Sequence, residues 1–273
     1  MLILISNLLS LLISFAFIFF VQPNWYFHPL IYIGGLIIGL LLFLIACLLL
    51  SFILVKDKNN VIKPRKTMSN IVYIVAKFVI SICNVKIISE GFEKLENTNC
   101  LFVSNHQSMM DPITIIASNK NIGLSFVMRQ NVEKIPIIGR CLVCGGFLTI
   151  NRSDNREGLL TIRKAISRVE NGYPIGIFPE GTRSKGPNMG PFHDGAFKIS
   201  VRSQSDICVV VIDNEYNIHK RSPFRRTKVY CKVCDILKYE DIKDMNTHEI
   251  GIIVRQIMEK GLLELREKYP IEL

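Results

Sequence analysis

Two long apolar runs open the chain, and the pattern of hydrophobic and polar positions changes after them. Residues 1–21 and 30–55 carry almost no charge. At 1.5 Å per residue the second run is long enough to cross a hydrocarbon core of about 30 Å. Residues 22–29 between the runs are rich in aromatic side chains, which gather at membrane–water interfaces. The pattern predicts two hydrophobic helices that form an antiparallel hairpin.

Basic residues follow the second run, and they set the predicted orientation. A cleaved signal peptide is the alternative for the first run, but that run lacks a basic start and its apolar stretch is too long. Cytoplasmic flanks of membrane segments are rich in lysine and arginine. We therefore predict a membrane anchor of two hydrophobic helices over 1–55, which either spans the bilayer or dips into one leaflet. A basic juxtamembrane linker over 56–67 and a cytosolic domain over 68–273 follow. The predicted location is the cell membrane, with the domain on the cytoplasmic face, or the endoplasmic reticulum membrane in a eukaryote. The basic residues are Lys56, Lys58, Lys63, Arg65 and Lys66, opposed by Asp57.

From residue 68 onward, short apolar runs alternate with segments of helical periodicity. Apolar residues at helical spacing over 68–83 predict an amphipathic helix. Strands interleaved with helices are typical of an α/β fold, so we predict a mixed sheet covered by helices. The predicted strands are 85–89, 100–104, 124–128, 147–150, 174–178, 207–212 and 229–233, and the predicted helices are 112–118, 156–170, 195–203 and 247–268.

The charge of the chain favours anionic partners. Its 273 residues carry a net charge of +10, from 33 basic and 23 acidic side chains, and 49% of them are hydrophobic. This balance suits an anionic membrane surface or phosphorylated substrates, with nucleic acid as the alternative. The local cluster of Lys220, Arg221, Arg225, Arg226 and Lys228 fits lipid head groups, a phosphorylated donor or a solvated loop better than nucleic acid. We expect membrane lipids as partners and no nucleic acid.

The eight cysteines do not form a secreted disulfide scaffold, because they are spread over a long chain. Two pairs, Cys141/Cys144 and Cys231/Cys234, have the C-x-x-C spacing of zinc ligands. The second pair lies in a predicted strand, where residues i and i+3 point to opposite faces. We therefore predict small buried thiols, with structural zinc as the alternative, and no metal site.

The first candidate site follows the predicted strand 100–104. His106 and Asp111 lie between this strand and the next predicted helix, at a sheet edge where α/β proteins place ligands. A tight turn would let the carboxylate hold one imidazole nitrogen and leave the other basic. In the alternative, Asp111 before Pro112 is a helix N-cap and His106 an ordinary turn residue.

Two further segments place polar side chains after predicted strands. In 178–184, with the sequence F-P-E-G-T-R-S, an acid, a hydroxyl and a guanidinium suit a polyol phosphate, because arginine grips phosphate through paired hydrogen bonds. The alternative is a solvated turn in which Glu180 pairs with Arg183. In 145–152, Arg152 closes another strand, and its alternative is a plain surface arginine.

Together, N-H-x-x-x-x-D at His106 and Asp111, the block 146–152 and F-P-E-G-T-R-S at 178–184 come in one order and spacing. In this the chain resembles the glycerolipid acyltransferase family, and within it the 1-acyl-sn-glycerol-3-phosphate (lysophosphatidic acid) acyltransferases. The resemblance covers roughly residues 80–235. The three segments are specific in combination, although each is weak alone.

The resemblance implies a role for each matching position. His106 would be the general base and Asp111 its orienting partner. Arg152, Glu180, Gly181, Thr182 and Arg183 would bind the acceptor. The implied reaction moves a fatty acyl group from acyl-CoA or acyl carrier protein to lysophosphatidate in phospholipid biosynthesis, without a further cofactor. Asn151 replaces the family's usual aspartate and removes a charge partner of Arg152, while 207–211 lacks the proline of the family's fourth block.

Other functional classes make different expectations. A membrane-tethered lipid-binding protein with a dead site would lose His106 or Asp111, and both are present. Glycerol 3-phosphate or another lysolipid is the alternative acceptor, and a lysolipid hydrolase is a further alternative. The sequence contains no G-x-S-x-G elbow, so direct transfer without an acyl-enzyme is expected.

Overall fold

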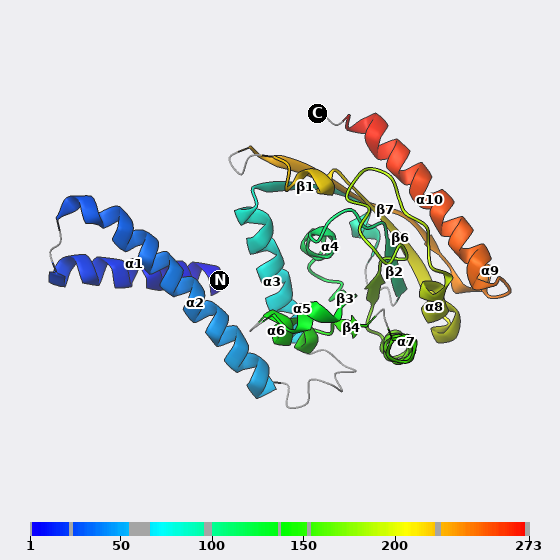
Figure 1. Cartoon of the computed structure of the whole chain (residues 1–273), viewed down its shortest axis with the longest axis horizontal. Coiled ribbons are helices and arrows are strands. Elements are labelled where there is room, and N and C mark those ends of the chain that lie inside the picture. The colour runs from blue at the N-terminus through cyan, green and yellow to red at the C-terminus, as the bar shows by residue number, and fades with distance from the viewer. Residues whose placement is uncertain are drawn as a thin grey trace.

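The computed structural model describes residues 2–21, 24–54, 66–95, 100–135, 138–151, 154–221 and 225–270, and it combines a helical hairpin with an α/β domain (Figure 1). The α-helices are α1 (Leu2–Val21), α2 (His28–Leu54), α3 (Lys66–Ile82), α4 (Asp111–Ser118), α5 (Gln130–Glu133), α6 (Ile138–Cys144), α7 (Asn155–Glu170), α8 (Lys198–Ser203), α9 (Tyr239–Ile242) and α10 (Thr247–Lys268). The strands are β1 (Val85–Glu90), β2 (Cys100–Ser104), β3 (Ser125–Arg129), β4 (Leu148–Ile150), β5 (Ile175–Ile177), β6 (Asp206–Asp213) and β7 (Thr227–Leu237). The 3-10 helices are η1 (Trp25–Phe27), η3 (Phe92–Lys94), η4 (Asp194–Phe197) and η5 (Glu215–Asn217).

The strands form one mixed sheet in the order β1-β7-β6-β2-β5-β3-β4, which confirms the predicted fold class. β6, β2, β5, β3 and β4 run parallel to their neighbours, whereas β7 pairs with β6 in the antiparallel direction. The carboxyl ends of the five parallel strands therefore meet at one edge of the sheet. The loops that follow these strands carry the candidate site residues.

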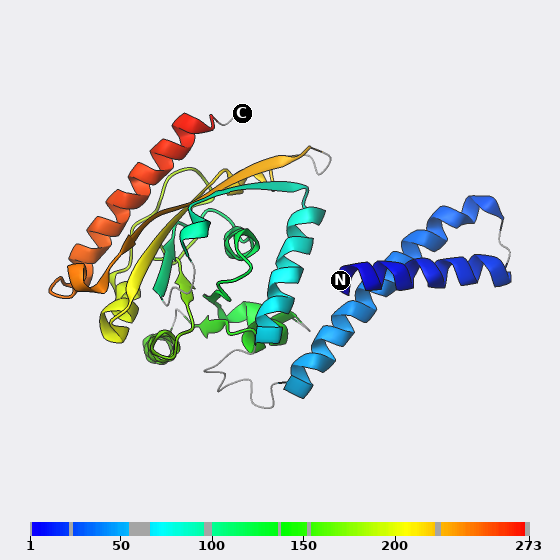
Figure 2. The ribbon, with the colours of Figure 1, turned by 180° about the vertical axis from the view of Figure 1, so that it is seen from behind.

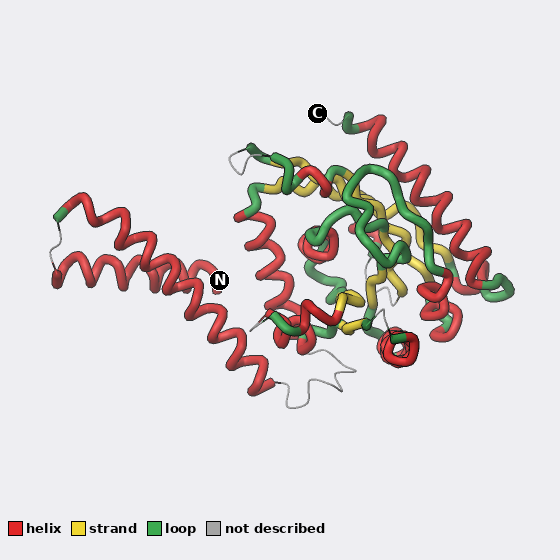
Figure 3. The backbone as a smooth tube through the Cα atoms, viewed as in Figure 1, coloured by secondary structure: helices red, strands yellow, loops and turns green. Residues whose placement is uncertain are grey.

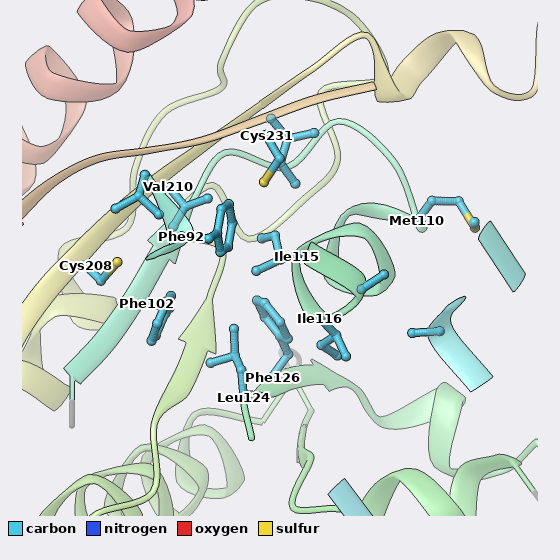
Figure 4. Packing of buried hydrophobic residues seen from close by; sticks show 14 of the residues in the cluster. Phe92, Phe102, Met110, Ile115, Ile116, Leu124, Phe126, Cys208, Val210 and Cys231 are labelled. Atoms are coloured by element: carbon cyan, nitrogen blue, oxygen red, sulfur yellow. The ribbon is translucent and has the colours of Figure 1, made fainter. Parts of the chain in front are cut away.

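Helices cover both faces of the sheet, and the middle residues of its central strands are apolar. In β2, Phe102 belongs to the core shared with α3 and α4, whereas Leu101 and Val103 belong to the core shared with α7, α8 and α10. Successive side chains of a strand point to opposite faces of the sheet, and here both faces are buried under helices. Figure 4 shows the first core, and Figure 2 shows from behind how α10 runs along the outer face of β7 and β6.

All seven predicted strands and the predicted helices are present, with differences at their ends. The segment 195–203 is divided, because its first turn is the 3-10 helix η4 and only Lys198–Ser203 is α-helical. β7 extends to Leu237, four residues beyond its predicted end, since a β-bulge opposite Val209 and Val210 lets it keep pairing with β6. The apolar pattern did not predict η1, η3, η5, α5 or α9, each of which has only three or four residues.

Cys231 and Cys234 lie on opposite faces of the sheet, as their spacing predicted. Cys231 is buried in the core beneath α4, whereas Cys234 packs against Gly261 of α10. Within the described residues, no group of three histidine, cysteine or acidic side chains is placed to hold a metal ion.

The N-terminal hairpin joins the domain through the second half of α2. Phe43 is buried with Met68 and Ile71 of α3, and the guanidinium of Arg140 in α6 lies 3.6 Å from the ring centroid of Phe52. Among the described residues, the window Trp25–Phe43 is long and apolar enough to cross a membrane by length and composition. Most of the predicted basic linker, up to residue 65, lies outside the described residues.

Gly176 in β5 gives a test of the core packing beneath the site. A Cβ built at Gly176 would lie 2.2 Å from the Phe126 ring, which is itself stacked on Phe178. Because that ring has no room to move, Gly176→Ala is expected to lower the free energy of unfolding by about 1–3 kcal/mol. Gly158→Ala in α7 is the matched control: its Cβ meets nothing within 4 Å, and alanine is the better helix former, so no loss is expected. Urea unfolding in detergent measures both, and equal stabilities of the two variants would contradict the packing.

Candidate functional site

The site lies at the sheet edge where the loops after β2, β5 and β6 meet. The loop after β2 carries His106 and leads into α4 at Asp111, and the loop after β5 carries the segment 178–184. Hydrogen bonds join these two loops to each other and to the end of β6. The structure therefore brings together segments that lie more than 70 residues apart in the sequence.

His106 and Asp111 form a hydrogen-bonded pair. His106 Nδ1 lies 2.7 Å from Asp111 Oδ2, which also accepts the N–H of Ser108 at 2.9 Å. A carboxylate accepts hydrogen bonds, so Nδ1 carries the proton and Nε2 keeps the basic lone pair. Asp111 is the first residue of α4, with Met110 at the N-cap position. The N-cap interpretation of Asp111 is therefore wrong, because its side chain turns back to the loop instead of capping the helix.

The electrostatics of the pair follow from its burial. The Asp111 side chain is fully buried, while 15% of the His106 side chain is exposed. Burial raises the pKa of Asp111 well above its usual range, opposed by the backbone N–H groups of Ser108 and Gln107. The nearby charge of Glu180 also raises this pKa, and that of Arg183 lowers it. The ionised form of Asp111 is therefore stabilised by the surrounding N–H donors and by the positive charge of Arg183.

A stack of three rings holds the imidazole plane. The ring centroid of His106 lies 4.2 Å from that of Phe178 with an interplanar angle of 15°, and Phe178 stacks on Phe126 at 5.2 Å. Both phenylalanines are buried. One face of the imidazole therefore packs on the core, and the hydrogen bond to Asp111 fixes the rotation of the ring in its plane. The sequence placed Phe178 at a strand end but gave no sign of this stack.

The loop after β5 holds the backbone of His106 from both sides. Glu180 Oε1 accepts the His106 N–H at 2.7 Å, and the Ser184 N–H donates to the His106 carbonyl at 2.8 Å. The second oxygen of Glu180 accepts the Gly190 N–H at 2.7 Å. Glu180 is buried, and burial raises its pKa. The solvated-turn interpretation of Glu180 is therefore wrong, because its carboxylate faces inward.

The remaining predicted acceptor-binding residues lie around this turn. Gly181 adopts a φ of 67°, a left-handed conformation that glycine takes without strain. Thr182 and Arg183 are exposed, and the charge of Arg183 acts on Asp111, so its guanidinium lies near the pair. Arg152 lies outside the described residues. The exposed hydroxyl and guanidinium leave a polar, cationic rim beside the imidazole.

The end of β6 is a third segment that lines the site, and the sequence analysis did not predict it. The Asn105 side chain bonds both the N–H and the carbonyl of Ile212, at 2.8 and 2.9 Å. Gln107 donates to Asp213 at 3.1 Å, and Asp213 in turn accepts two hydrogen bonds from Arg266 of α10. The signal for these contacts in the sequence was the run of polar residues, including Asn105 and Gln107, directly after the buried strand β2.

A family model described as Acyltransferase matches residues 86–213. A 1-acyl-sn-glycerol-3-phosphate acyltransferase of Borreliella burgdorferi is 29% identical over 192 residues, which cover 67% of this chain and 75% of that protein. The protein of the same name from Haemophilus influenzae is 26% identical, over 63% of this chain and 71% of its own length. A chloroplastic one from Brassica napus is 34% identical over 42% of this chain, and the match spans only 33% of that protein.

Among solved structures, the chain is similar to the 1-acyl-sn-glycerophosphate (LPA) acyltransferase PlsC from Thermotoga maritima. The TM-score is 0.64 with 23% sequence identity, and the match covers 100% of both chains. This likeness confirms the fold.

Glu180 provides a test of how the two loops are joined. Glu180→Gln keeps the shape but replaces one accepting oxygen by an amide that donates, so one of the two buried backbone N–H groups loses its partner. We expect the free energy of unfolding to fall by about 1–3 kcal/mol. Glu170→Gln, at the exposed end of α7, is the control and should be neutral. Denaturant unfolding measures both, and a Glu180→Gln variant as stable as the wild type would disprove the inward hydrogen bonds.

Proposed function

We propose that this chain, whose residues 86–213 match the acyltransferase family model, transfers a fatty acyl group from an acyl thioester to the free hydroxyl of 1-acylglycerol 3-phosphate, forming phosphatidate in phospholipid biosynthesis. The observation that carries the proposal is the 2.7 Å contact between His106 and the buried carboxylate of Asp111, beside the exposed Arg183. The names of two relatives that are matched over 75% and 71% of their own length support the choice of acceptor. The match spans 33% of the length of each of two plant relatives.

The pair performs general-base catalysis in this mechanism. His106 Nε2 takes the proton of the acceptor hydroxyl as the hydroxyl oxygen attacks the thioester carbonyl carbon. The tetrahedral intermediate then breaks its C–S bond, and the leaving thiolate takes the proton back from the imidazolium. Asp111 keeps Nδ1 protonated and stabilises the imidazolium while it exists. A positioned general base contributes about 10²–10⁴-fold, and the orientation of two bound substrates supplies the rest.

Acceptor binding uses the cationic rim. Arg183 grips the phosphate through paired, charge-assisted hydrogen bonds, and Thr182 adds a hydroxyl. Arg152 contributes a second guanidinium, and Gly181 lets the acceptor approach the backbone. Glu180 acts from within, because its carboxylate fixes His106 and Gly190.

The acyl donor is acyl-CoA or acyl carrier protein, and no further cofactor is required. The acceptor and the product reside in a bilayer, which fits a chain that carries an apolar hairpin on α3 and α6. We place the protein in the cell membrane with the domain on the cytoplasmic face, or in the endoplasmic reticulum membrane of a eukaryote. Its partners are membrane lipids, lysophosphatidate and the donor, and nucleic acid is not among them.

His106→Ala tests the assigned base. The variant loses the proton acceptor, so transfer from labelled donor to lysophosphatidate is expected to fall by about 10²–10⁴-fold. Membrane association should persist, because the hairpin is untouched. His219→Ala, at an exposed position after η5, is the matched control and should stay active. An active His106→Ala enzyme would overturn the assignment. The same assay with glycerol 3-phosphate or other lysolipids tests the acceptor, and omission of the donor reveals a hydrolase.

Arg183→Ala tests the phosphate site. Loss of a charge-assisted contact worth about 1.5–3 kcal/mol raises KM for lysophosphatidate by about 10–100-fold, while KM for the donor stays nearly constant. Arg202→Ala, on an exposed position of α8, is the control. Initial rates at varied concentrations of each substrate measure both constants. Equal losses for donor and acceptor would exclude a phosphate-specific role.

A further inference from the structure

A second carboxyl group lies buried behind the pair, and the mechanism does not use it. Glu215 begins η5, directly after the loop that ends β6, and its side chain is fully buried. Its Oε1 accepts the hydroxyl hydrogen of Thr114 at 2.8 Å, and its backbone N–H donates to Gln107 Oε1 at 3.2 Å. Thr114 lies one helical turn after Asp111 in α4, and Gln107 follows His106. Glu215 therefore contacts both flanks of the His106–Asp111 pair.

The unused oxygens indicate the protonation state of Glu215. Oε2 of Glu215 and Oδ1 of Asp111 are buried, and neither has a hydrogen-bond partner among the described residues. A buried carboxylate oxygen without a donor is costly, and two such charges close together cost more. Asp111 has donors on its other oxygen and the charge of Arg183 nearby, whereas Glu215 Oε1 receives a single neutral hydroxyl. A proton is therefore more stable on Glu215 than on Asp111.

We propose that Glu215, as a neutral carboxylic acid, is a positioning residue for the catalytic pair: its carboxyl group fixes the first turn of α4 through Thr114, while its backbone N–H holds Gln107 in the loop of His106. This inference rests on the proposed function for its kinetic consequences. With Glu215 neutral, Asp111 contacts the imidazole without a further charge behind it, which keeps the imidazole from becoming too basic to release its proton to the leaving group. An ionised Glu215 would add a second charge there.

The surroundings of Glu215 agree with this protonation state. Burial raises the pKa of Glu215 well above its usual range, and the charge of Asp111 raises it further, against the hydrogen bond from Thr114. Cys231 of β7 is the other titratable neighbour, and its pKa is raised by burial and by Glu215. Neither neighbour supplies a positive charge. Among these contacts the Thr114 hydrogen bond alone favours the carboxylate, and burial and the charge of Asp111 oppose it.

Stability against pH tests the protonation state directly. The unfolded chain releases the Glu215 proton near its ordinary pKa of about 4.3, while the folded chain retains it. Wild-type stability therefore falls as pH rises above that value, until the folded pKa is reached. Glu215→Gln removes this term, so its Tm relative to that of wild type should increase between about pH 5 and about pH 8. A constant difference, or one that decreases, would show that Glu215 is ionised in the fold.

Kinetics test the positioning role. Glu215→Gln mimics the neutral acid and is expected to keep kcat within about threefold and the midpoints of the pH–rate profile within about half a unit. Glu215→Leu and Thr114→Val should each lower kcat by about 10-fold or more with KM nearly constant. If Glu215→Leu fails to fold, Thr114→Val decides the question. Ser200→Ala is the matched control, because it removes a buried hydroxyl hydrogen bond in α8 away from the site. A fully active Thr114→Val enzyme, or a shifted profile in Glu215→Gln, would overturn the proposal.

An NMR readout separates this proposal from the proposed reaction. The imidazole signals of His106 should move in Thr114→Val and hold in Ser200→Ala and Glu215→Gln. If the wild type transfers no acyl group, the proposed function fails, yet the Tm series and these signals still decide the role of Glu215. Unchanged imidazole signals in Thr114→Val would disprove positioning even in an active enzyme.

Discussion

The carboxylate of Asp111 has no access to solvent, and a buried charge persists only where donors and opposite charges surround it. Here the partners are the imidazole of His106, the N–H of Ser108 and the nearby charge of Arg183. Each partner must stay within hydrogen-bond or Coulomb range for the ionised form to survive. The geometry of the whole site follows from this requirement, because a displaced loop would return the proton to the carboxyl group and end the support of the imidazole.

The sheet meets that requirement by bringing three loops to one edge. Parallel strands β2, β5 and β6 end side by side, and polar side chains in the loops bond to the backbone of their neighbours. Asn105 completes the ladder at the end of β6, and Glu180 joins the His106 loop to Gly190. The charged side chains of the site are thus fixed by hydrogen bonds to the backbone of rigid elements, so the site is preorganised before a substrate binds.

The hairpin and the domain are joined on the side of α3 and α6. Phe43 of α2 is buried there, whereas the end of the hairpin at η1 lies away from the domain (Figure 3). The window Trp25–Phe43 is long and apolar enough to cross a membrane by length and composition. An apolar hairpin joined to a domain with a polar site suits the proposed reaction, whose acceptor has both an acyl chain and a phosphate.

The sequence by itself determined the element order, the two-faced burial of the strands and the identity of His106, Asp111 and Arg183 as site candidates, because hydrophobic periodicity and strand–loop motifs are local properties. It did not determine where the side chain of Glu180 points, nor the contacts of Glu215 with Thr114 and Gln107. Those contacts join residues 74 to 108 positions apart. They exist only because β5 and β6 take their places on either side of β2 in the sheet, and that order is a result of global packing that no local pattern encodes.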